Sequence, residues 1–280
     1  MSDDVSALGL SRTGIDTSVA HPARIWNYWL GGKDNFAVDR EVGERLMSIL
    51  PELVDSVRAD RQFLARAVEY LAAQAGIRQF LDIGTGLPTA DNTHQIAQRV
   101  AAESRIVYVD NDPLVLSHAR ALLTSTPQGA CDYLHADARE TGMIMAGAAA
   151  TLDLARPIAI MMLGILNFVL DDDEAQAIVH RLMDSVPSGS YLVISHPTAE
   201  VDPEPAMRMQ QAWNRQGAAE LRTRTREEIV KFFEPGRAGG CLVFALAARP
   251  GGQCRDRRGG AFLRRRSQAV TSQRLTTARG

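Results

Sequence analysis

The stretch Gln79-Phe-Leu-Asp-Ile-Gly-Thr-Gly-Leu-Pro-Thr-Ala-Asp91 decides the fold of this chain. It begins with a short apolar run around Asp82, which predicts a buried strand. Gly84 and Gly86 then allow the backbone to turn tightly and leave space for a ligand against the main chain. Residues 92–102 have helical composition. A strand, a glycine turn and a helix in this order are typical of a nucleotide-binding α/β fold.

The spacing of these glycines distinguishes between nucleotide ligands. The dinucleotide fingerprint requires a third glycine three residues after the second, and this chain has Thr89 there. The pattern Asp-x-Gly-x-Gly, which begins at Asp82, instead suits a ligand with a charged amino group and no pyrophosphate, namely S-adenosylmethionine. It resembles the first motif of class I S-adenosylmethionine-dependent methyltransferases. Because short glycine turns are common, a plain strand-to-helix turn is the alternative.

A second β-branched run, residues 105–110, also ends in an acid. The Asp110 carboxylate at this strand end can accept hydrogen bonds from both hydroxyls of a ribose, and Asn111 follows it as a further cofactor-binding candidate. The alternative for Asp110 is a helix cap or turn residue, since Pro113 is well suited to open the next helix.

Residues 131–137 predict a third strand, which ends in Asp137. The class I resemblance implies that Asp137 accepts from the exocyclic amine of adenine and that the Ala138 backbone meets a ring nitrogen; a solvated loop acid is the alternative. Together with Asp82 and Asp110, three successive strands end in acids. Ligands of open α/β sheets bind at the carboxyl edge, so we expect the cofactor there.

The aromatic segment 21–40 is unusual, because two of the three tryptophans flank Tyr28. A Gly31-Gly32 break follows, and then a polar cluster that includes Lys33 and Asn35. Aromatic side chains beside a glycine hinge predict a lid over a ligand. The alternative is a short amphipathic helix that packs its aromatic side chains on the core.

Two segments carry a closer resemblance: Ala23-Arg-Ile-Trp-Asn-Tyr-Trp-Leu-Gly-Gly-Lys-Asp-Asn-Phe36 and Arg78-Gln-Phe-Leu-Asp-Ile-Gly-Thr-Gly-Leu-Pro-Thr89. They resemble one bacterial methyltransferase family that was long carried as a domain of unknown function. The resemblance covers roughly residues 20–234. It implies a Rossmann-like class I sheet with helices on both faces and S-adenosylmethionine as the cofactor, and it favours the lid interpretation. It implies no acceptor.

The chain is of ordinary globular composition, with 280 residues, 45% hydrophobic and 23% charged. Its net charge of −2 gives no indication of nucleic-acid binding. The three cysteines, Cys131, Cys241 and Cys254, have neither metal-site nor disulfide spacing, which suits a reducing cytoplasm. The longest apolar run, residues 158–170, is too short for a membrane span of about 20 residues. Residues 1–20 lack a signal-peptide core and predict a flexible leader.

Helical composition over residues 39–49 and 52–75 predicts a helical cover, so we divide the ordered chain into a cover at 21–75 and a cofactor domain at 76–235. Three arginines lie mostly on the outer faces of the second helix: Arg58, Arg61 and Arg66. One of them can bind the cofactor carboxylate, although a solvated position is the preferred interpretation for each.

Two further strands are expected, at 157–163 and 191–196. The class I resemblance places a fourth-strand motif after the first of them, where Asn167 is a candidate acceptor-site residue. The second strand ends in His196, whose imidazole can take a proton from an acceptor. We favour the alternative, a histidine that is hydrogen-bonded at a strand end.

The tail from residue 236 to 280 departs from this pattern. Ten arginines, no lysine and the single acid Asp256 give it a charge of +9, and the net charge of −2 for the whole chain leaves −11 for residues 1–235. Only 241–248 reads as a strand, which puts the C-terminal hairpin implied by the resemblance in doubt. Our hypothesis is a shifted reading frame or an unrelated extension; the alternative is a disordered basic arm that binds nucleic acid.

Methyl transfer from a sulfonium is a direct displacement, so the protein mainly aligns the reactants. No nucleophile or metal ligand set is needed, and the sequence predicts none. We therefore expect a methyltransferase for a small-molecule acceptor, with no membrane partner. An NAD(P)-binding oxidoreductase and a non-catalytic S-adenosylmethionine-binding protein are the alternatives. The sequence does not indicate the oligomeric state.

Overall fold

Strand β1 (Gln79–Ile83) is buried along its whole length. It pairs in parallel with β2 (Arg105–Asp110) on one side and with β4 (Ala159–Leu163) on the other. A parallel strand buried in this way must be covered by helices on both faces, which explains the nearly unbroken apolar runs of these strands. The computed structural model describes residues 15–88, 91–122, 124–200, 202–216, 219–233, 240–246 and 264–265.

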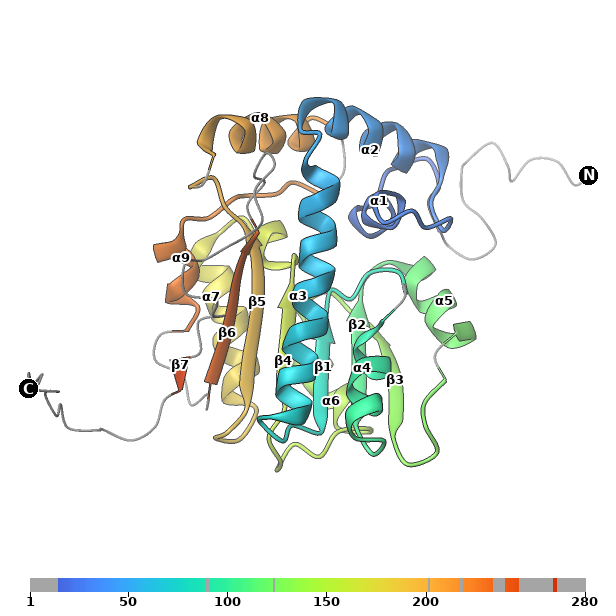
Figure 1. Cartoon of the computed structure of the whole chain (residues 1–280), viewed down its shortest axis with the longest axis vertical. Coiled ribbons are helices and arrows are strands. Elements are labelled where there is room, and N and C mark those ends of the chain that lie inside the picture. The colour runs from blue at the N-terminus through green and yellow to red at the C-terminus, as the bar shows by residue number, and fades with distance from the viewer. Residues whose placement is uncertain are drawn as a thin grey trace, which may run out of the picture.

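The sheet has the order β3-β2-β1-β4-β5-β6-β7 (Figure 1). Every pairing from β3 through β6 is parallel, and only β7 is antiparallel. The remaining strands are β3 (Ala130–His135), β5 (Tyr191–Pro197), β6 (Gly240–Leu246) and β7 (Arg264–Arg265). The chain reverses its direction of travel across the sheet between β1 and β4, and ligands of such sheets bind at this switch point.

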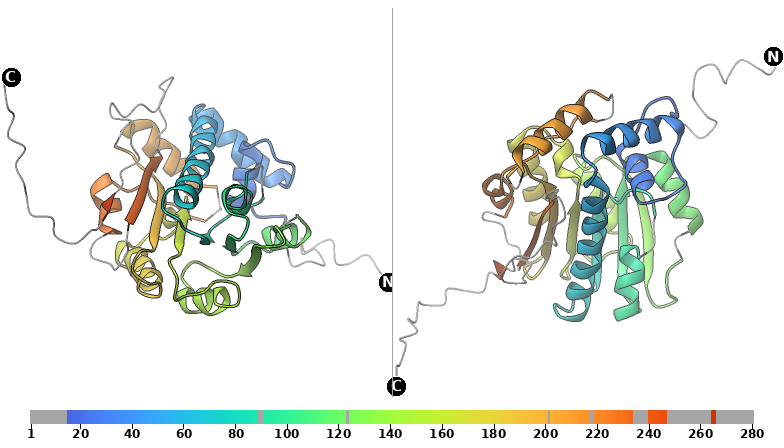
Figure 2. Two further views of the ribbon diagram at one scale, coloured as in Figure 1. Left: turned by 60° about the horizontal axis from the view of Figure 1, so that its bottom comes forward. Right: turned by 45° about the horizontal axis from the view of Figure 1, so that its top comes forward.

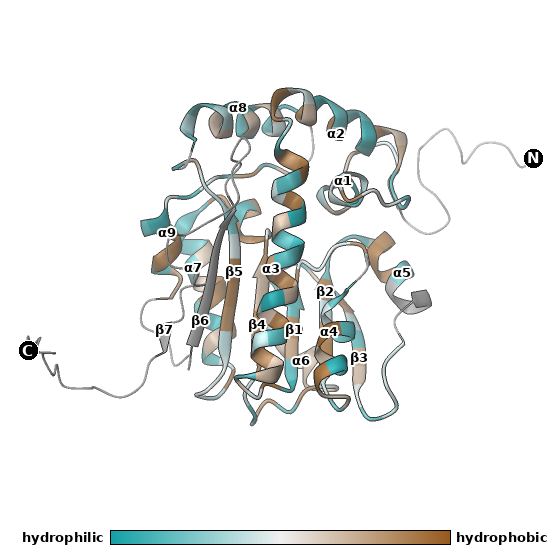
Figure 3. Ribbon diagram, viewed as in Figure 1, coloured by the Kyte–Doolittle hydropathy of each residue, from teal (hydrophilic) through white to brown (hydrophobic). Residues whose placement is uncertain are grey.

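Helices cover the sheet on two sides. One face packs on α3 (Leu53–Ala73) and α4 (Thr93–Val100) through buried residues such as Phe63 and Phe80. The other face packs on α6 (Thr141–Ala148), α7 (Asp172–Asp184) and α9 (Arg226–Lys231). Residues of high hydropathy recur along α3 and the central strands (Figure 3).

A third layer lies beyond the carboxyl ends of the strands (Figure 2). It consists of α1 (Pro22–Trp29), α2 (Ala37–Ile49) and α8 (Pro203–Asn214), which share one buried apolar cluster. In this cluster the ring centroids of Trp29 and Trp213 lie 6.0 Å apart. Helix α3 runs from this layer down the sheet. The cover expected over residues 21–75 is therefore divided, because α3 packs on the sheet while α1 and α2 pack with α8.

The remaining elements are α5 (Pro113–Leu122) and the short 3₁₀ helix η2 (Leu166–Phe168). Ile15, which was expected in a flexible leader, is buried with residues of α5. Residues 1–14 lie outside the described residues. No helix of the described part of the chain is long and apolar enough to cross a membrane.

The strand expected at 241–248 is β6, which continues the parallel sheet beside β5. Its antiparallel partner β7 has only two residues, so the doubtful C-terminal pairing is reduced to Gly240 with Arg265 and Cys241 with Arg264. The rest of the tail, residues 236–239, 247–263 and 266–280, lies outside the described residues, and its origin stays a hypothesis.

Candidate active site

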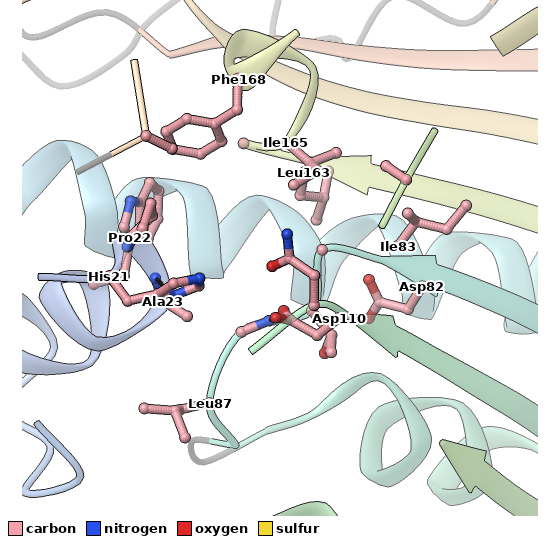
Figure 4. A pocket seen from close by; sticks show the side chains of 18 of the residues that line it. His21, Pro22, Ala23, Asp82, Ile83, Leu87, Asp110, Leu163, Ile165 and Phe168 are labelled. Carbon is pink, nitrogen blue, oxygen red and sulfur yellow. Dashed lines mark hydrogen bonds between the residues drawn. The ribbon is translucent and has the colours of Figure 1, made fainter. Parts of the chain in front are cut away.

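A cavity of about 360 Å³ lies at the carboxyl ends of the strands. The ends of β1, β2 and β3 form its floor, together with the turns that follow them. Helix α1, helix α3 and η2 form its walls. Figure 4 shows Asp82 and Asp110 at the strand ends, His21 and Pro22 from the start of α1, and Phe168 from η2 around the same space.

The glycine turn after β1 is built as the sequence predicts. Gly84 and Gly86 have φ angles of 75° and 66°, a region that side chains rarely adopt. A Cβ atom on Gly84 would meet Ile165 at 2.8 Å, whereas nothing lies within 4 Å of a Cβ atom on Gly86. Gly84 therefore permits close packing against the turn after β4, and Gly86 leaves open space at the cavity.

Asp110 is buried at the end of β2, and each of its oxygens already accepts a backbone hydrogen bond. Gly86 N donates to Oδ2 at 2.7 Å and Asp112 N donates to Oδ1 at 2.9 Å. Burial raises the pKa of Asp110, which these hydrogen bonds counteract. A carboxylate oxygen has a second lone pair, so Asp110 can still accept hydrogen bonds from a ligand in the cavity.

Asn111, Asp137 and Ala138 line the cavity beside Asp110. Asn111 Nδ2 donates to Asp137 Oδ2 at 3.3 Å, which joins the turn after β2 to the turn after β3. Arg139 also donates to Asp137, from its backbone nitrogen at 2.9 Å. The structure thus brings all seven predicted cofactor residues, Asp82, Gly84, Gly86, Asp110, Asn111, Asp137 and Ala138, to one cavity.

The carboxyl groups of Asp82 and Asp60 also border the cavity. Asp82 at the end of β1 accepts from Thr93 Oγ1 at 2.6 Å. Asp60 projects from α3 and is only 4% exposed. Burial raises the pKa of both groups to about 6. The charge of Arg61, which also lines the cavity, lowers the pKa of each only in part.

The comparisons with known proteins bear on this arrangement. A family model described as S-adenosyl methyltransferase matches residues 9–241. The chain belongs to this S-adenosyl methyltransferase family. A solved DUF574 family protein from Streptomyces avermitilis is 47% identical, with 81% of this chain and 86% of that chain covered and a TM-score of 0.77. A comparison with curated proteins gave no match.

A second solved structure, from Thermobifida fusca, carries a provisional name as a methyltransferase. It is 38% identical, with 79% of this chain and 82% of that chain covered and a TM-score of 0.72. The predictions of the family, the α/β fold, the methyltransferase activity and S-adenosylmethionine as cofactor are confirmed. The roles of single residues stay predictions.

The cavity of this methyltransferase fits its cofactor in charge and in space. S-adenosylmethionine carries a sulfonium and an ammonium group, and buried carboxylates with raised pKa values are stabilised by added positive charge. Asp82 and Asp110 provide such carboxylates, and Gly86 leaves the space beside them open. Within the described residues, no cluster of three or more His, Cys, Asp or Glu side chains is placed to hold a metal ion.

The lid candidates occupy different places from those expected. Lys33 is exposed, Tyr28 donates to Glu44 at 3.1 Å, and Asn35 donates to Asn27 and to the Gly32 carbonyl, so none of these three lines the cavity. The same segment does border the cavity, but through other residues: Trp26 and Asn27 of α1 and Leu30, which caps the helix. Their spacing in the sequence follows the turn of the helix, because residues three or four apart share a face.

A buried ion pair between Arg24 of α1 and Asp112, which follows β2, holds α1 at the carboxyl edge of the sheet. Arg24 is 3% exposed and Asp112 is completely buried. Asp112 lies two residues after Asp110 and donates its backbone N–H to that carboxylate. The wall formed by α1 is therefore linked directly to the predicted ribose-binding residue.

The two remaining candidates lie behind the cavity wall. Asn167 is buried in η2, with no partner for its Oδ1 atom among the described residues, and does not line the cavity. His196 is completely buried. Its Nδ1 lies 2.9 Å from the Pro197 carbonyl, and its Nε2 lies 3.0 Å from Arg224 Nη1. Because Arg224 can only donate, Nε2 accepts and Nδ1 carries the proton.

Burial lowers the pKa of His196 to about 4, so the ring is neutral near neutral pH. Both ring nitrogens of His196 are engaged in hydrogen bonds, and this favours a structural role for the residue over a catalytic one. Arg224 is 2% exposed, and it also donates to the Leu166 and Val169 carbonyls at 2.8 and 2.7 Å. It thereby holds η2, the segment that carries Phe168 into the cavity wall.

Proposed function

We propose that this protein transfers the methyl group of S-adenosylmethionine to a small-molecule acceptor bound in the same cavity. One observation carries the proposal: a single cavity of about 360 Å³ extends from the predicted cofactor residues at the strand ends to an aromatic wall formed by Trp26 and Phe168. A donor and a small acceptor can therefore occupy adjoining parts of one cavity.

The proposed cofactor site uses the strand ends and one helix. Asp110 and Asn111 hold the ribose, and Asp137 with the Ala138 backbone contacts the adenine. At the other end, Asp82 attracts the ammonium group. Arg61 neutralises the carboxylate, since it lines the cavity while Arg58 and Arg66 are exposed and do not.

The sulfonium supplies an activated methyl group, so the protein has to align the acceptor and exclude water. Holding two reactants in line lowers a barrier by on the order of 7–11 kcal/mol. The walls suit this task, because α1 is fixed by the Arg24–Asp112 ion pair and η2 is fixed by Arg224. The acceptor approaches from the side of Trp26, Leu64 and Phe168.

Calorimetry with S-adenosylmethionine tests the site. The wild type should bind, Asp110→Ala and Arg61→Met should each weaken binding by about tenfold or more, and Asp55→Ala should not change it. Asp55 is a matched control because it is an acid of the same helix, α3, with a side chain 80% exposed. Binding that is equal in all four proteins would contradict the proposed site.

Turnover separates the proposed enzyme from a binding protein. S-adenosylhomocysteine should form when the wild type receives S-adenosylmethionine and a panel of small acceptors. Reduced nicotinamide cofactors should not bind. Tight binding of a reduced nicotinamide cofactor, with none of S-adenosylmethionine, would instead support the oxidoreductase alternative.

A further inference from the structure

Asp60 occupies a position at which helix α3 otherwise buries apolar side chains. The buried face of α3 carries Val57, Leu64 and Val68, and Asp60 lies between the first two at helical spacing. The carboxyl group is 4% exposed and borders the cavity. Burying a carboxylate among apolar side chains is costly, so the fold gains nothing from an acid at this position.

The surroundings of Asp60 leave its carboxylate incompletely satisfied. Within the described residues, neither Asp60 Oδ1 nor Ser195 Oγ makes a hydrogen bond of ordinary geometry, although the Ser195 hydroxyl lies close enough to act on the Asp60 carboxylate. Burial raises the pKa of Asp60 to about 6, the Ser195 hydroxyl and the Arg61 charge lower it in part, and the Asp82 charge raises it further. Asp60 is therefore mainly ionised at neutral pH. Its Oδ1 is shielded, whereas Oδ2 is not among the shielded atoms and makes no hydrogen bond within the described residues, so Oδ2 is the oxygen available to a ligand in the cavity.

The cavity around Asp60 combines apolar walls with negative charge. Trp26, Leu64 and Phe168 provide apolar surface, and the exposed Glu220 adds a second acid at the rim. Three basic side chains also line the cavity: His21 at the start of α1, Arg61 beside Asp60 on α3, and Arg139 after Ala138. They are outnumbered by the acids of the lining, which are Asp60, Asp82, Asp110, Asp137 and Glu220. An acceptor with an apolar body and a basic nitrogen matches these walls in both shape and charge.

We propose that Asp60 is a catalytic residue that binds the nitrogen of a small amine acceptor and receives the proton that this nitrogen loses. This assignment rests on the proposed methyl transfer. The bound ammonium first gives a proton to the Asp60 carboxylate, which frees the nitrogen lone pair. This lone pair forms the new bond to the methyl carbon while the carbon–sulfur bond breaks and its electron pair stays on sulfur. The product leaves as the methylated ammonium and Asp60 passes its proton to solvent, so charge and atoms balance.

Calorimetry on the full chain saturated with S-adenosylhomocysteine tests this assignment. The probes are 2-phenylethylamine and 2-phenylethanol, which share an apolar body and differ in the amine. The wild type should bind the amine about tenfold more tightly than the alcohol, because hydrogen bonds to charged groups are the stronger ones. Asp60→Asn should bind both probes equally, while Asp55→Asn, on the exposed face of the same helix and outside the cavity, should keep the preference.

The pH dependence of the wild type provides a second measurement that needs no variant. The preference for the amine should decline as the pH falls through about 6, because Asp60 becomes protonated. The affinity for the alcohol should change little. A wild type without preference for the amine, a preference that survives in Asp60→Asn, or one that is unchanged at low pH overturns the assignment. Failure of the wild type to bind S-adenosylhomocysteine would instead refute the proposed function.

Discussion

The guanidinium group of Arg24 binds both carboxylate oxygens of Asp112, although 88 positions separate the two residues. Nε lies 2.9 Å from Oδ2 and Nη2 lies 3.1 Å from Oδ1. Arg24 Nη1 also donates to the Asp16 carbonyl at 2.7 Å. One side chain thus joins the segment before α1, α1 itself and the turn after β2.

Removing this arginine should destabilise the fold. Arg24→Met leaves the Asp112 carboxylate buried without its partner, which costs about 3–5 kcal/mol of unfolding free energy. Arg99→Met is the matched control: its ion pair with Asp91 is about 60% exposed on both sides, so a change of about 0–1 kcal/mol is expected. Urea unfolding at pH 7 measures both variants. Equal losses would show that the buried pair contributes no more than the exposed one.

The Arg24–Asp112 ion pair should also make the unfolding free energy depend on pH. Burial raises the pKa of Asp112, but the Arg24 hydrogen bonds and the nearby His21 outweigh it and hold the pKa below its usual value. A carboxyl group with a lowered pKa in the folded state stabilises the protein above its unfolded pKa, and loses this effect as the pH falls. The difference between wild type and Arg24→Met should therefore narrow below about pH 4.

Asp60 and Asp82 should have the opposite effect on the unfolding free energy, which they lower as the pH rises. Their folded pKa values are raised to about 6 from 3.8. Between these values the unfolded chain releases protons that the folded chain keeps, so stability falls as the pH rises. Asp60→Asn should reduce this fall between pH 4 and 7 by about 2–3 kcal/mol, and Asp55→Asn should not. Urea unfolding at both pH values decides, and an unchanged slope in Asp60→Asn would contradict the prediction.

Gly86 and Gly76 form a matched pair for testing the cavity. Both have a positive φ, 66° and 70°, and neither has an atom within 4 Å of a built Cβ. Each change to Ala should cost about 1 kcal/mol of stability from backbone strain. Only Gly86 lines the cavity, so only Gly86→Ala should weaken S-adenosylmethionine binding in calorimetry. Weakening by both substitutions would point to a general loss of structure.

Substituting Arg224 or Arg222 tests how much the hydrogen bonds of Arg224 to η2 stabilise the fold. Arg224→Met strips hydrogen bonds from His196 Nε2 and from two buried carbonyls, and should cost about 3–5 kcal/mol. The Arg222 side chain is 35% exposed and bonds mainly to partly exposed acids, so Arg222→Met should cost about 0–1 kcal/mol. Thermal unfolding compares the two. Similar transition temperatures would rule out a special contribution from Arg224.

Most of the sheet could be predicted because its signals are local. β-branched and apolar runs mark β1, β2 and β4, and the glycines of the turn after β1 are required by positive φ angles. The acids at the ends of three strands share one edge because parallel strands point the same way. The side chains of the 21–40 segment that line the cavity were harder to predict. Trp26 and Asn27 line it because of the face of α1 on which they lie, and residue type alone does not reveal that face.

Local sequence therefore determined the strand–turn–helix unit, the succession of elements along the chain and the set of residues at the carboxyl edge, because backbone propensity and unbroken apolar runs act over a few residues. Only the tertiary structure decided the partners of Arg24 and Arg224 and the orientation of Asp60. An arginine shows no periodic signal of burial, and it becomes buried only when a carboxylate or carbonyls from distant segments satisfy its five donors. Asp60 faces the cavity because α3 packs its apolar stripe on the sheet, and that contact fixes the rotation of the helix.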